Sequence, residues 1–421
     1  RRMAALSAET GELLWSDRHL PSGHHSPEDL LVVGGLLWTG DIAATKGSGR
    51  FEGRDIQTGE VLHEFLPDIK TYWFHQRCYR SKATERFLMP SRTGIEFIDP
   101  TTEHWDINHW VRGGCIYGVM PCNGLVYAPP HSCACYIDAK LNGFNAIAPD
   151  SGTRSIPDEI PDEGRLMKGP AYGTTRHLSE GDLTENWPTL RHDNKRSGRT
   201  ATELPSLLEP AWKTRLGGRL SSVVLYDGLL FVAQIDEHEL HALDSKSGEK
   251  RWSYRAGGRI DSPPTCYNGC VYFGSADGYV YCLRVLDGSL VWSFRAAPMD
   301  QRLMAYGQIE SVWPVHGTVL IQSDVLYCVA GRSMFLDDGL RLLMLDPVTG
   351  EKLNEVVLDE QDPETGENLQ TRLSGLNMPT SMPDVLSCDG EFLYMRTQRF
   401  DLDGVRQFIA PTPAREQSGE G

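Results

Sequence analysis

The 421-residue sequence predicts an all-β fold, and two observations lead to that prediction. A pattern of the form Asp-x-x-Ser/Thr-Gly-Glu-x-x-Trp recurs along the chain, most clearly in Asp244–Trp252, while helical periodicity is nearly absent. The central position of the pattern recurs about every 40–50 residues where no insertion intervenes, which is typical of a propeller with four-stranded blades. These central positions are Gly11, Gly59, Thr102, Gly152, Gly248, Gly288 and Gly350.

Each residue type in the pattern has a physical reason to be there. The Asp accepts hydrogen bonds from turn amides, and the Gly supplies the positive φ that closes a tight hairpin. The Trp then falls on the outermost strand, where its large side chain favours packing between neighbouring blades. We therefore expect a set of residues to lock blades together rather than to do chemistry: Trp15, Trp212, Gly248, Trp252, Gly288 and Trp292.

Three stretches are each predicted to form four consecutive strands, namely residues 219–257, 259–297 and 311–359. Residues 3–16 supply only the last two strands of a blade, and residues 382–400 supply only the first two. The two ends could therefore form one composite blade, which would give a closed ring of seven blades and remove both open sheet edges. The alternative is that the chain is a fragment of an eight-bladed ring.

The domain organisation follows from where the repeat holds and where it lapses. We expect propeller blades over residues 1–152, an irregular proline-rich insertion over 153–209, further blades over 210–400 and a disordered tail over 401–421, all within one propeller. Within the third of these, Pro210–Gly218 is expected to complete the blade that begins at Cys115.

Bulk composition narrows the function classes. The chain has 41 basic and 57 acidic residues, for a net charge of -16, which disfavours nucleic acid as a partner. No apolar run of about 18 residues occurs, so no transmembrane segment is expected. No signal peptide is recognisable in the first residues of this chain.

Two motifs resemble a known family. Ala242–Trp252 looks like the tryptophan-docking motif of the pyrroloquinoline-quinone (PQQ) type propeller repeat, and "WPTLRHDNKRSGRT" (Trp187–Thr200) is similar to the segment that often precedes such propellers. The repeat occurs in quinoprotein alcohol dehydrogenases, in the outer-membrane assembly lipoprotein propeller and in uncharacterised bacterial PQQ-binding-like proteins. The resemblance implies a periplasmic or otherwise exported bacterial protein of the cell envelope. In the dehydrogenases it also implies PQQ held by calcium beneath two adjacent cysteines; here Cys133 and Cys135 are separated by one residue.

Candidate ligand-binding residues lie where polar side chains interrupt the blade pattern, because the first strand of each blade lines the central channel. Packing between blades does not explain charged or aromatic residues at such positions, and binding loops concentrate on rigid scaffolds. The residues expected at the channel mouth are His75, Arg77, Arg259, Asp261, Arg302, Glu310, Trp313 and His316.

A second candidate site is a cluster of soft ligands within residues 115–135. Thiolates with one imidazole suit zinc or copper(I). A disulfide, or thiols buried as small apolar groups, would explain the same residues. The potential metal ligands are Cys115, Cys122, His131, Cys133 and Cys135.

These observations favour a binding or scaffold module for a protein, a polymer or a small molecule. The alternative is a quinone- or metal-dependent oxidoreductase of the quinoprotein dehydrogenase type, with its site in the channel beside the Cys/His segment. A carbohydrate-active or sugar-binding propeller is a third reading, favoured only by aromatic residues such as Trp73, Trp110 and Trp313. It ranks last because paired catalytic carboxylates cannot be assigned from the sequence.

Overall fold

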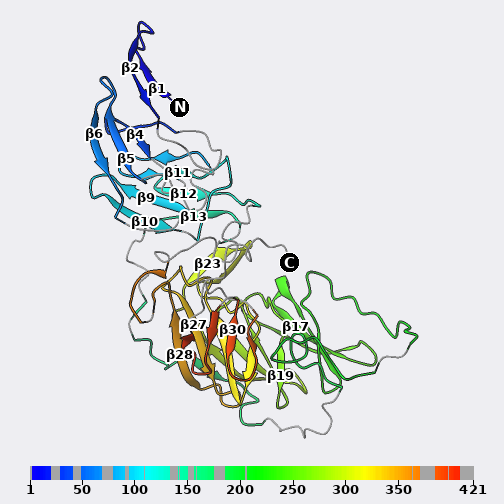
Figure 1. Cartoon of the computed structure of the whole chain (residues 1–421). Coiled ribbons are helices and arrows are strands. Elements are labelled where there is room, and N and C mark those ends of the chain that lie inside the picture. Colours follow the sequence, from blue (N-terminus) through cyan, green and yellow to red (C-terminus); the bar gives the residue numbers. More distant parts are fainter. Residues whose placement is uncertain are drawn as a thin grey trace. The chain divides into compact units, whose positions relative to one another are not determined.

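A computed structural model describes most of the chain, which divides into two compact units (Figure 1). The first contains residues 1–153, 361–379 and 410–421, and the second contains residues 154–360 and 380–409. The described residues are all except 1, 20–28, 41–48, 69–78, 91–93, 109, 133–140, 142, 150–155, 158, 175–184, 204–205, 363, 370–384, 397 and 408–421. Across these described residues there is no α-helix, and each unit is built from antiparallel sheets.

The first unit contains four sheets in which strands consecutive in sequence are neighbours. The N-terminal hairpin pairs β1 (Arg2–Leu6) with β2 (Leu13–Arg18). A three-stranded sheet is formed by β11 (Met120–Cys122), β12 (Leu125–Ala128) and β13 (Asn145–Ile147). Between them lie two four-stranded sheets, β3 (Leu31–Val33), β4 (Leu36–Gly40), β5 (Phe51–Asp55) and β6 (Val61–Phe65), then β7 (Lys82–Ala83), β8 (Leu88–Met89), β9 (Ile95–Asp99) and β10 (His104–Asn108).

The second unit contains four sheets of four or five strands and one two-stranded hairpin. The first sheet is β15 (Val224–Tyr226), β16 (Leu229–Gln234), β17 (Glu239–Asp244) and β18 (Lys250–Arg255). The second is β19 (Thr265–Tyr267), β20 (Cys270–Gly274), β21 (Tyr279–Arg284) and β22 (Leu290–Arg295), extended by β14 (Leu166–Lys168). After the hairpin of β23 (Arg302–Ala305) and β24 (Gln308–Ser311) come the last two, β25 (Leu320–Gln322), β26 (Val325–Ala330), β27 (Leu340–Leu345) and β28 (Lys352–Leu358), then β29 (Ser387–Cys388), β30 (Leu393–Met395), β31 (Gln398–Phe400) and β32 (Arg406–Gln407).

The predicted all-β fold of four-stranded propeller blades is confirmed, and the described strands differ from the expected strand assignments at the chain ends and in the insertion. The chain ends do not share a composite blade, because β29–β32 form a complete sheet and β1 and β2 pair only with each other among the described strands. Pro210–Gly218 forms no strand, and the sheet that begins near Cys115 has three strands in the described part of the chain. The expected irregular insertion contributes β14, and the expected tail contributes β32.

The apolar cores lie between successive sheets, and a tryptophan contact recurs at their outer ends. Trp292 of β22 is fully buried against Gly350, and its indole Nε1 donates a hydrogen bond to Pro347 O at 3.1 Å. Gly350 has φ of +72°, and a Cβ there would lie 2.6 Å from the indole ring, so the turn requires glycine. The same arrangement joins Trp15 to Ile56 O and Gly59, Trp212 to Ser245 O and Gly248, and Trp252 to Val285 O and Gly288.

The segment Trp187–Gly198 ties the first strands of all four second-unit sheets together. Trp187 exchanges two backbone hydrogen bonds with Leu225 of β15. The amides of Cys266 in β19 and Cys388 in β29 donate to Pro188 O and Asn194 O at 2.7 and 2.8 Å, and Asn194 Nδ2 donates to Ile321 O of β25 at 2.6 Å. These bonds place the first strands, and the loops that lead into them, at fixed positions.

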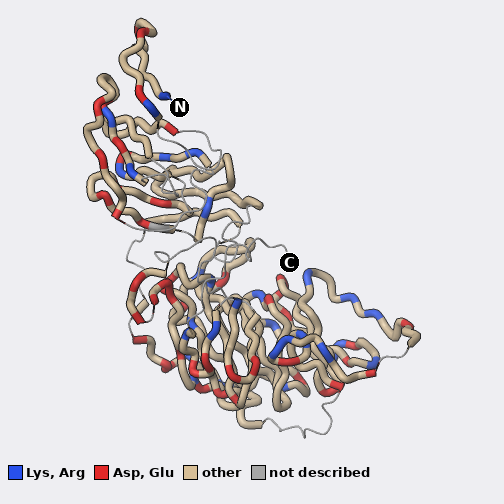
Figure 2. Tube along the Cα trace, viewed as in Figure 1, with Lys and Arg blue, Asp and Glu red and all other residues tan. Residues whose placement is uncertain are grey.

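Charged residues are spread over both units, and acidic positions occur on strands and turns alike (Figure 2). Of the described helical segments, none is long and apolar enough to cross a membrane.

Candidate functional site

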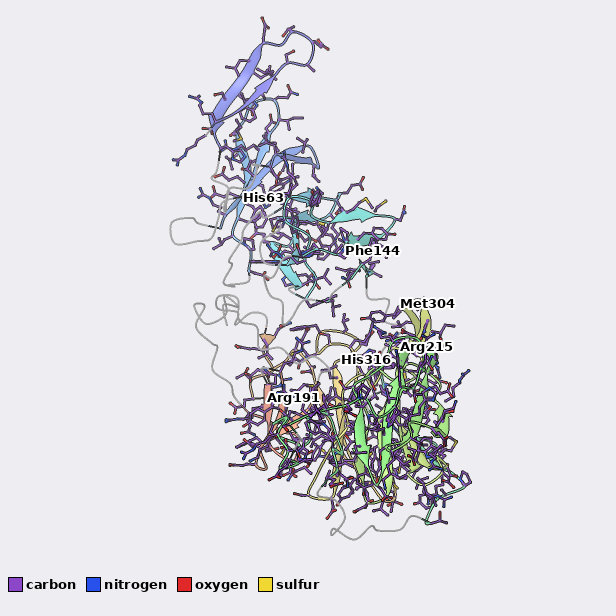
Figure 3. The ribbon with its side chains drawn as sticks, turned by 90° about the vertical axis from the view of Figure 1, so that its right-hand side faces the viewer. His63, Phe144, Arg191, Arg215, Met304 and His316 are labelled. Carbon is purple, nitrogen blue, oxygen red and sulfur yellow. The ribbon has the colours of Figure 1, made fainter. Side chains whose placement is uncertain are left out.

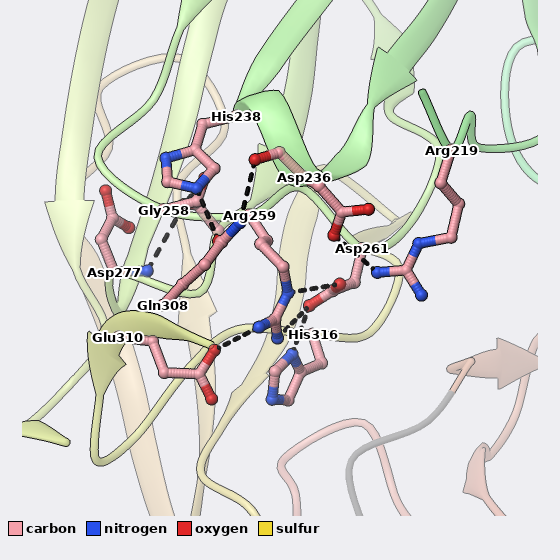
Figure 4. Close-up of polar contacts among 11 residues, drawn as sticks. Arg219, Asp236, His238, Gly258, Arg259, Asp261, Asp277, Gln308, Glu310 and His316 are labelled. Atoms are coloured by element: carbon pink, nitrogen blue, oxygen red, sulfur yellow. Dashed lines mark hydrogen bonds and ion pairs between the residues drawn. The ribbon is translucent and has the colours of Figure 1, made fainter. Parts of the chain in front are cut away.

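Four of the predicted channel-mouth residues meet in the second unit. Arg259 and Asp261 lie in the segment that leads into β19, Glu310 lies in β24, and His316 lies in the loop before β25 (Figure 4). Together these elements form a charged cluster, defined as Arg259, Asp261, Glu310 and His316.

The hairpin that carries Glu310 is set by its turn. Tyr306 and Gly307 both have positive φ, 51° and 75°, which is the conformation of a two-residue hairpin turn whose twist matches the strands. The register pairs Leu303 with Glu310 and Met304 with Ile309. Because successive side chains alternate between sheet faces, Leu303 and Glu310 share one face, and Met304 and Ile309 share the other.

Arg259 is held between two carboxylates. Its Nη1 lies 2.8 Å from Glu310 Oε2, and its Nε and Nη2 donate to the two oxygens of Asp261 at 3.1 and 3.3 Å. Asp261 Oδ2 also lies 2.6 Å from His316 Nδ1. The side chains of Arg259 and Glu310 are each 2% exposed, whereas those of Asp261 and His316 are 23% and 24% exposed.

Burial and pairing act in opposite directions on the ionisation of this cluster. Burial raises the pKa of Glu310, although the charges of Arg259 and His316 oppose the rise. Burial also disfavours the charged form of Asp261, but the hydrogen bonds from His316 and Arg259 outweigh it and lower its pKa to about 2. For Arg259, burial is outweighed by the bonds to Asp261 and the charge of Glu310, so its pKa is raised.

Polar contacts beside the cluster fix the hairpin against β17 and its preceding turn. His238 Nε2 lies 2.8 Å from Gln308 Oε1, and Gln308 Nε2 donates to Asp236 O at 3.0 Å. Arg219 donates to Asp236 Oδ1 at 2.9 Å (Figure 4). The hairpin is therefore anchored by Glu310 on one face and by Gln308 at its turn.

The other face of the hairpin is apolar and open to solvent. Met304 is 67% exposed and its cross-strand neighbour Ile309 is 61% exposed. Tyr306 in the turn is 80% exposed, and the Arg259 guanidinium lies 4.4 Å from the centre of its ring. Met304 and His316 both lie toward the hairpin end of the second unit in Figure 3.

The remaining residues predicted at the channel mouth do not belong to the charged cluster. Trp313 is 1% exposed and donates from Nε1 to Asp337 O, so it is a core residue and not the surface contact that we expected. Arg302 is partly exposed and paired with Asp300 at 2.9 Å, outside the charged cluster. His75 and Arg77 lie outside the described residues.

The proposed soft-ligand site is not assembled in the described part of the chain. Cys115 and Cys122 are exposed, and His131 Nε2 is bonded to Arg112 O at 2.9 Å. Within the described ranges no three His, Cys, Asp or Glu side chains are grouped so that they could hold a metal ion. Cys133 and Cys135 lie outside those ranges, so the metal hypothesis stays a prediction.

Sequence reasoning missed the residues that give this site its surface: Met304, Tyr306 and Ile309. The signal was present, because "RLMAYGQIES" places a Tyr-Gly turn between two short runs of alternating residues. We treated the stretch as an insertion between blades, and the alternation over four residues on each side is too short to predict which face is buried.

Comparison with known proteins relates this region to a family model. Residues 190–391 match the family model described as "Outer membrane protein assembly factor BamB". The quinoprotein ethanol dehydrogenase of Pseudomonas aeruginosa is 24% identical over 269 residues, which cover 60% of this chain and 37% of that protein. The outer membrane protein assembly factor BamB of Burkholderia pseudomallei is 30% identical over 99 residues, covering 23% of this chain and 26% of that protein.

Among solved structures, a quinohemoprotein alcohol dehydrogenase from Pseudomonas putida HK5 aligns with a TM-score of 0.42 at 13% identity, over 54% of this chain and 40% of that one. BamB from Moraxella catarrhalis aligns with a TM-score of 0.25 at 17% identity, over 45% of this chain and 59% of that one. The chain thus spans well under two thirds of these relatives. Residues 190–391, which lie mostly in the second unit, are thus similar to the BamB family model, and the relatives that this chain resembles include both a quinoprotein dehydrogenase and an outer membrane protein assembly factor.

Proposed function

We propose that this protein is a non-catalytic binding module that presents the outward face of the β23–β24 hairpin to a partner protein. The observation that carries the proposal is the contrast between the two faces of that hairpin. One face is anchored by the buried Glu310–Arg259 pair, while the other exposes Met304 and Ile309, and Tyr306 is exposed in the turn between the two strands. A rigidly supported cluster of exposed Met and aromatic residues is typical of protein-binding surfaces.

In this proposal the charged cluster holds the β23–β24 hairpin in position and does not act as a reactive centre. Each of its carboxylates is bonded to Arg259, and Asp261 is also bonded to His316. Because these groups form ion pairs with one another, the hairpin is held in one position before a partner arrives, which lowers the entropy cost of binding.

A location in the bacterial cell envelope is part of the proposal. It is supported by the matching family model and by one relative, both of which are outer membrane protein assembly factors. Other relatives are quinoprotein dehydrogenases, which is why an oxidoreductase is the second candidate.

The charged cluster does not fit the cofactor that a quinoprotein dehydrogenase requires. Its calcium-held quinone needs a free set of Glu, Asn and Asp ligands, whereas Asp261 and Glu310 at the mouth are committed to Arg259 and His316. We therefore derive no catalytic step for this chain.

Site-specific photo-crosslinking tests the proposal. A benzophenone amino acid at position 304 or 309 is expected to capture one predominant protein in cell envelopes, identified by mass spectrometry. The same probe at Leu286, which is 79% exposed in the turn before β22, is the matched control. The captured protein should then bind the purified chain, and Met304→Ser with Ile309→Ser should weaken that binding at least tenfold. Equal capture from all three positions, or undiminished binding by the double variant, would contradict the proposal.

A further inference from the structure

The outermost strands of the second-unit sheets differ in how their free edges are protected. An outermost strand leaves a row of backbone N–H and C=O groups that can pair with another chain, and proteins usually block such edges. The four strands concerned are β18, β22, β28 and β32. Three of them are blocked, each in a different way, and β28 is not blocked by any strand of the described residues.

The edge of β22 is covered by β14 from the same chain. The amide of Arg295 donates to Arg165 O, and the amide of Gly169 donates to Val291 O, both at 2.8 Å. Under this cover Val291 and Ser293 are almost fully buried. The molecule thus shows directly that the outer edge of a blade accepts a short antiparallel strand.

The edge of β18 is protected by exposed charged side chains, and the edge of β32 is protected because that strand is short. Arg251 and Arg255 of β18 have side chains that are 56% and 68% exposed. Exposed long cations on an edge strand oppose strand addition. Within the described residues β32 consists of Arg406 and Gln407, which is too short to template another strand.

β28 lacks these protections. It is seven residues long and pairs only with β27 among the described strands. Counted from the turn glycine, Leu353 and Val357 occupy the positions of Arg251 and Arg255 in β18, and they are 56% and 42% exposed. The amide of Glu355 donates to the side chain of Asn354 at 2.9 Å, so a side chain of the same strand, and not another strand, takes this hydrogen bond.

The charges of β28 itself do not guard the edge, because they point into the fold. Glu355 Oε2 lies 2.7 Å from the buried Arg165 and 3.3 Å from Lys352, and Lys352 also pairs with Asp162 at 2.5 Å. The residues flanking the strand are acidic, namely Glu351 before it and Asp359 and Glu360 after it. A strand that approaches this edge therefore meets two apolar side chains between acidic ends.

From this comparison we infer that the outer edge of β28 is an interaction surface that binds an extended segment of a partner protein by β-strand addition. The occupant is a strand with apolar residues at alternate positions and basic residues at its ends. The apolar residues complement Leu353 and Val357, and the basic residues complement the acidic flanks. A second copy of this chain is disfavoured as the occupant, because two chains of net charge -16 repel each other. The inference deepens the proposed binding function with a second surface, separate from the β23–β24 hairpin.

The test uses the full chain and the labelled peptide Lys-Val-Thr-Val-Thr-Val-Lys, followed by fluorescence anisotropy and hydrogen exchange. The peptide is expected to bind saturably and to slow exchange of the β28 amides but not of the β18 amides. N-methylation of the two central peptide amides, or replacement of both lysines by glutamate, should weaken binding at least tenfold. The first change removes strand hydrogen bonds, and the second reverses the charge match.

Protein variants give the matched comparison. Leu353→Arg with Val357→Arg copies the edge of β18 and should weaken peptide binding at least tenfold, while Val348→Arg, in the exposed β27–β28 turn, should leave it unchanged. Undiminished binding of the N-methylated peptide or by the double variant would overturn the inference. So would a dimer whose β28 amides are already protected without peptide. The hairpin residues are untouched in these variants, so capture at position 304 reports separately on the proposed function.

Discussion

Asp261 illustrates how a single residue in this fold couples burial to charge. Its carboxylate is removed from most solvent, yet it remains ionised because Arg259 and His316 both bond to it. The two effects have opposite signs, and the depressed pKa of about 2 shows that pairing is the larger.

The depressed pKa of Asp261 predicts a pH dependence of stability. Its folded pKa of about 2 lies below its ordinary value of 3.8, so ionised Asp261 stabilises the fold above pH 4, and this stabilisation is lost as the pH falls from about 4 to about 2. The full effect is about 2 kcal/mol. Urea unfolding of the wild type and of Asp261→Asn should differ by that amount at pH 6 and converge only as the pH falls to about 2. A difference that is independent of pH would mean that Asp261 contributes through packing and not through its charge.

Trp292 tests the contact between successive sheets. Trp292→Ala removes a fully buried indole and leaves a cavity, which should lower the free energy of unfolding by about 3–5 kcal/mol. Trp292→Phe keeps most of the packing and loses the bond to Pro347 O, and it should cost only about 1–2 kcal/mol because Tyr272 still donates to that oxygen. Denaturant titrations followed by circular dichroism would measure both changes. Equal losses for the two variants would show that the hydrogen bond, and not the indole volume, dominates.

At the scale of the element, β14 and the adjacent Arg165 connect two successive sheets, β19–β22 and β25–β28. It pairs with β22, while the adjacent Arg165 reaches Glu355 of β28 at 2.7 Å and donates to Arg295 O and Ala296 O. Its guanidinium also lies 4.9 Å from the centre of the Phe294 ring. One short strand therefore closes a sheet edge and neutralises a carboxylate in the next blade.

Removing the Arg165 side chain should uncouple these two blades. Arg165→Met leaves Glu355 buried without its closest cation, and we expect a loss of about 3–5 kcal/mol in unfolding free energy. The double variant Arg165→Met with Glu355→Leu removes both charges and should recover at least half of that loss. If the double variant is as unstable as the sum of the single ones, the two side chains do not interact.

At the scale of the whole second unit, the segment Trp187–Gly198 makes the four sheets interdependent. Arg196 is central to it: the side chain is buried, Nε donates to Leu386 O at 2.9 Å, and Nη1 donates to Thr189 Oγ1 at 2.8 Å. Burial lowers the pKa of Arg196 to about 10, which still leaves it charged at neutral pH.

This connection predicts a cooperative response to mutation. Arg196→Met should speed hydrogen exchange in the first strands of all four sheets, β15, β19, β25 and β29, because they share the segment as a hydrogen-bonding partner. Arg199→Met, at the exposed position directly after the segment, is the control and should change none of them. Faster exchange confined to β29 would show that the segment supports the sheets individually.

The sequence by itself determined the repeating unit, because the unit depends on local chemistry. The turn of Asp244–Gly248 follows from an Asp that caps backbone amides and a Gly that tolerates positive φ, and alternating side chains fix the strands on either side. The same reasoning selected Arg259, Asp261, Glu310 and His316 as polar residues that blade packing does not require.

Only the tertiary structure decided how these residues are used. That Arg259 pairs with both Asp261 and Glu310, that Trp313 is buried, and that β14 covers β22 all depend on contacts between residues far apart in the chain. The exposure of Leu353 and Val357 is decided in the same way, because an apolar residue on an outermost strand is buried or open according to whether another strand lies beside it. Local sequence patterns specify the hairpins. The packing of the sheets decides which strand, if any, covers an outermost strand and which charged side chains pair.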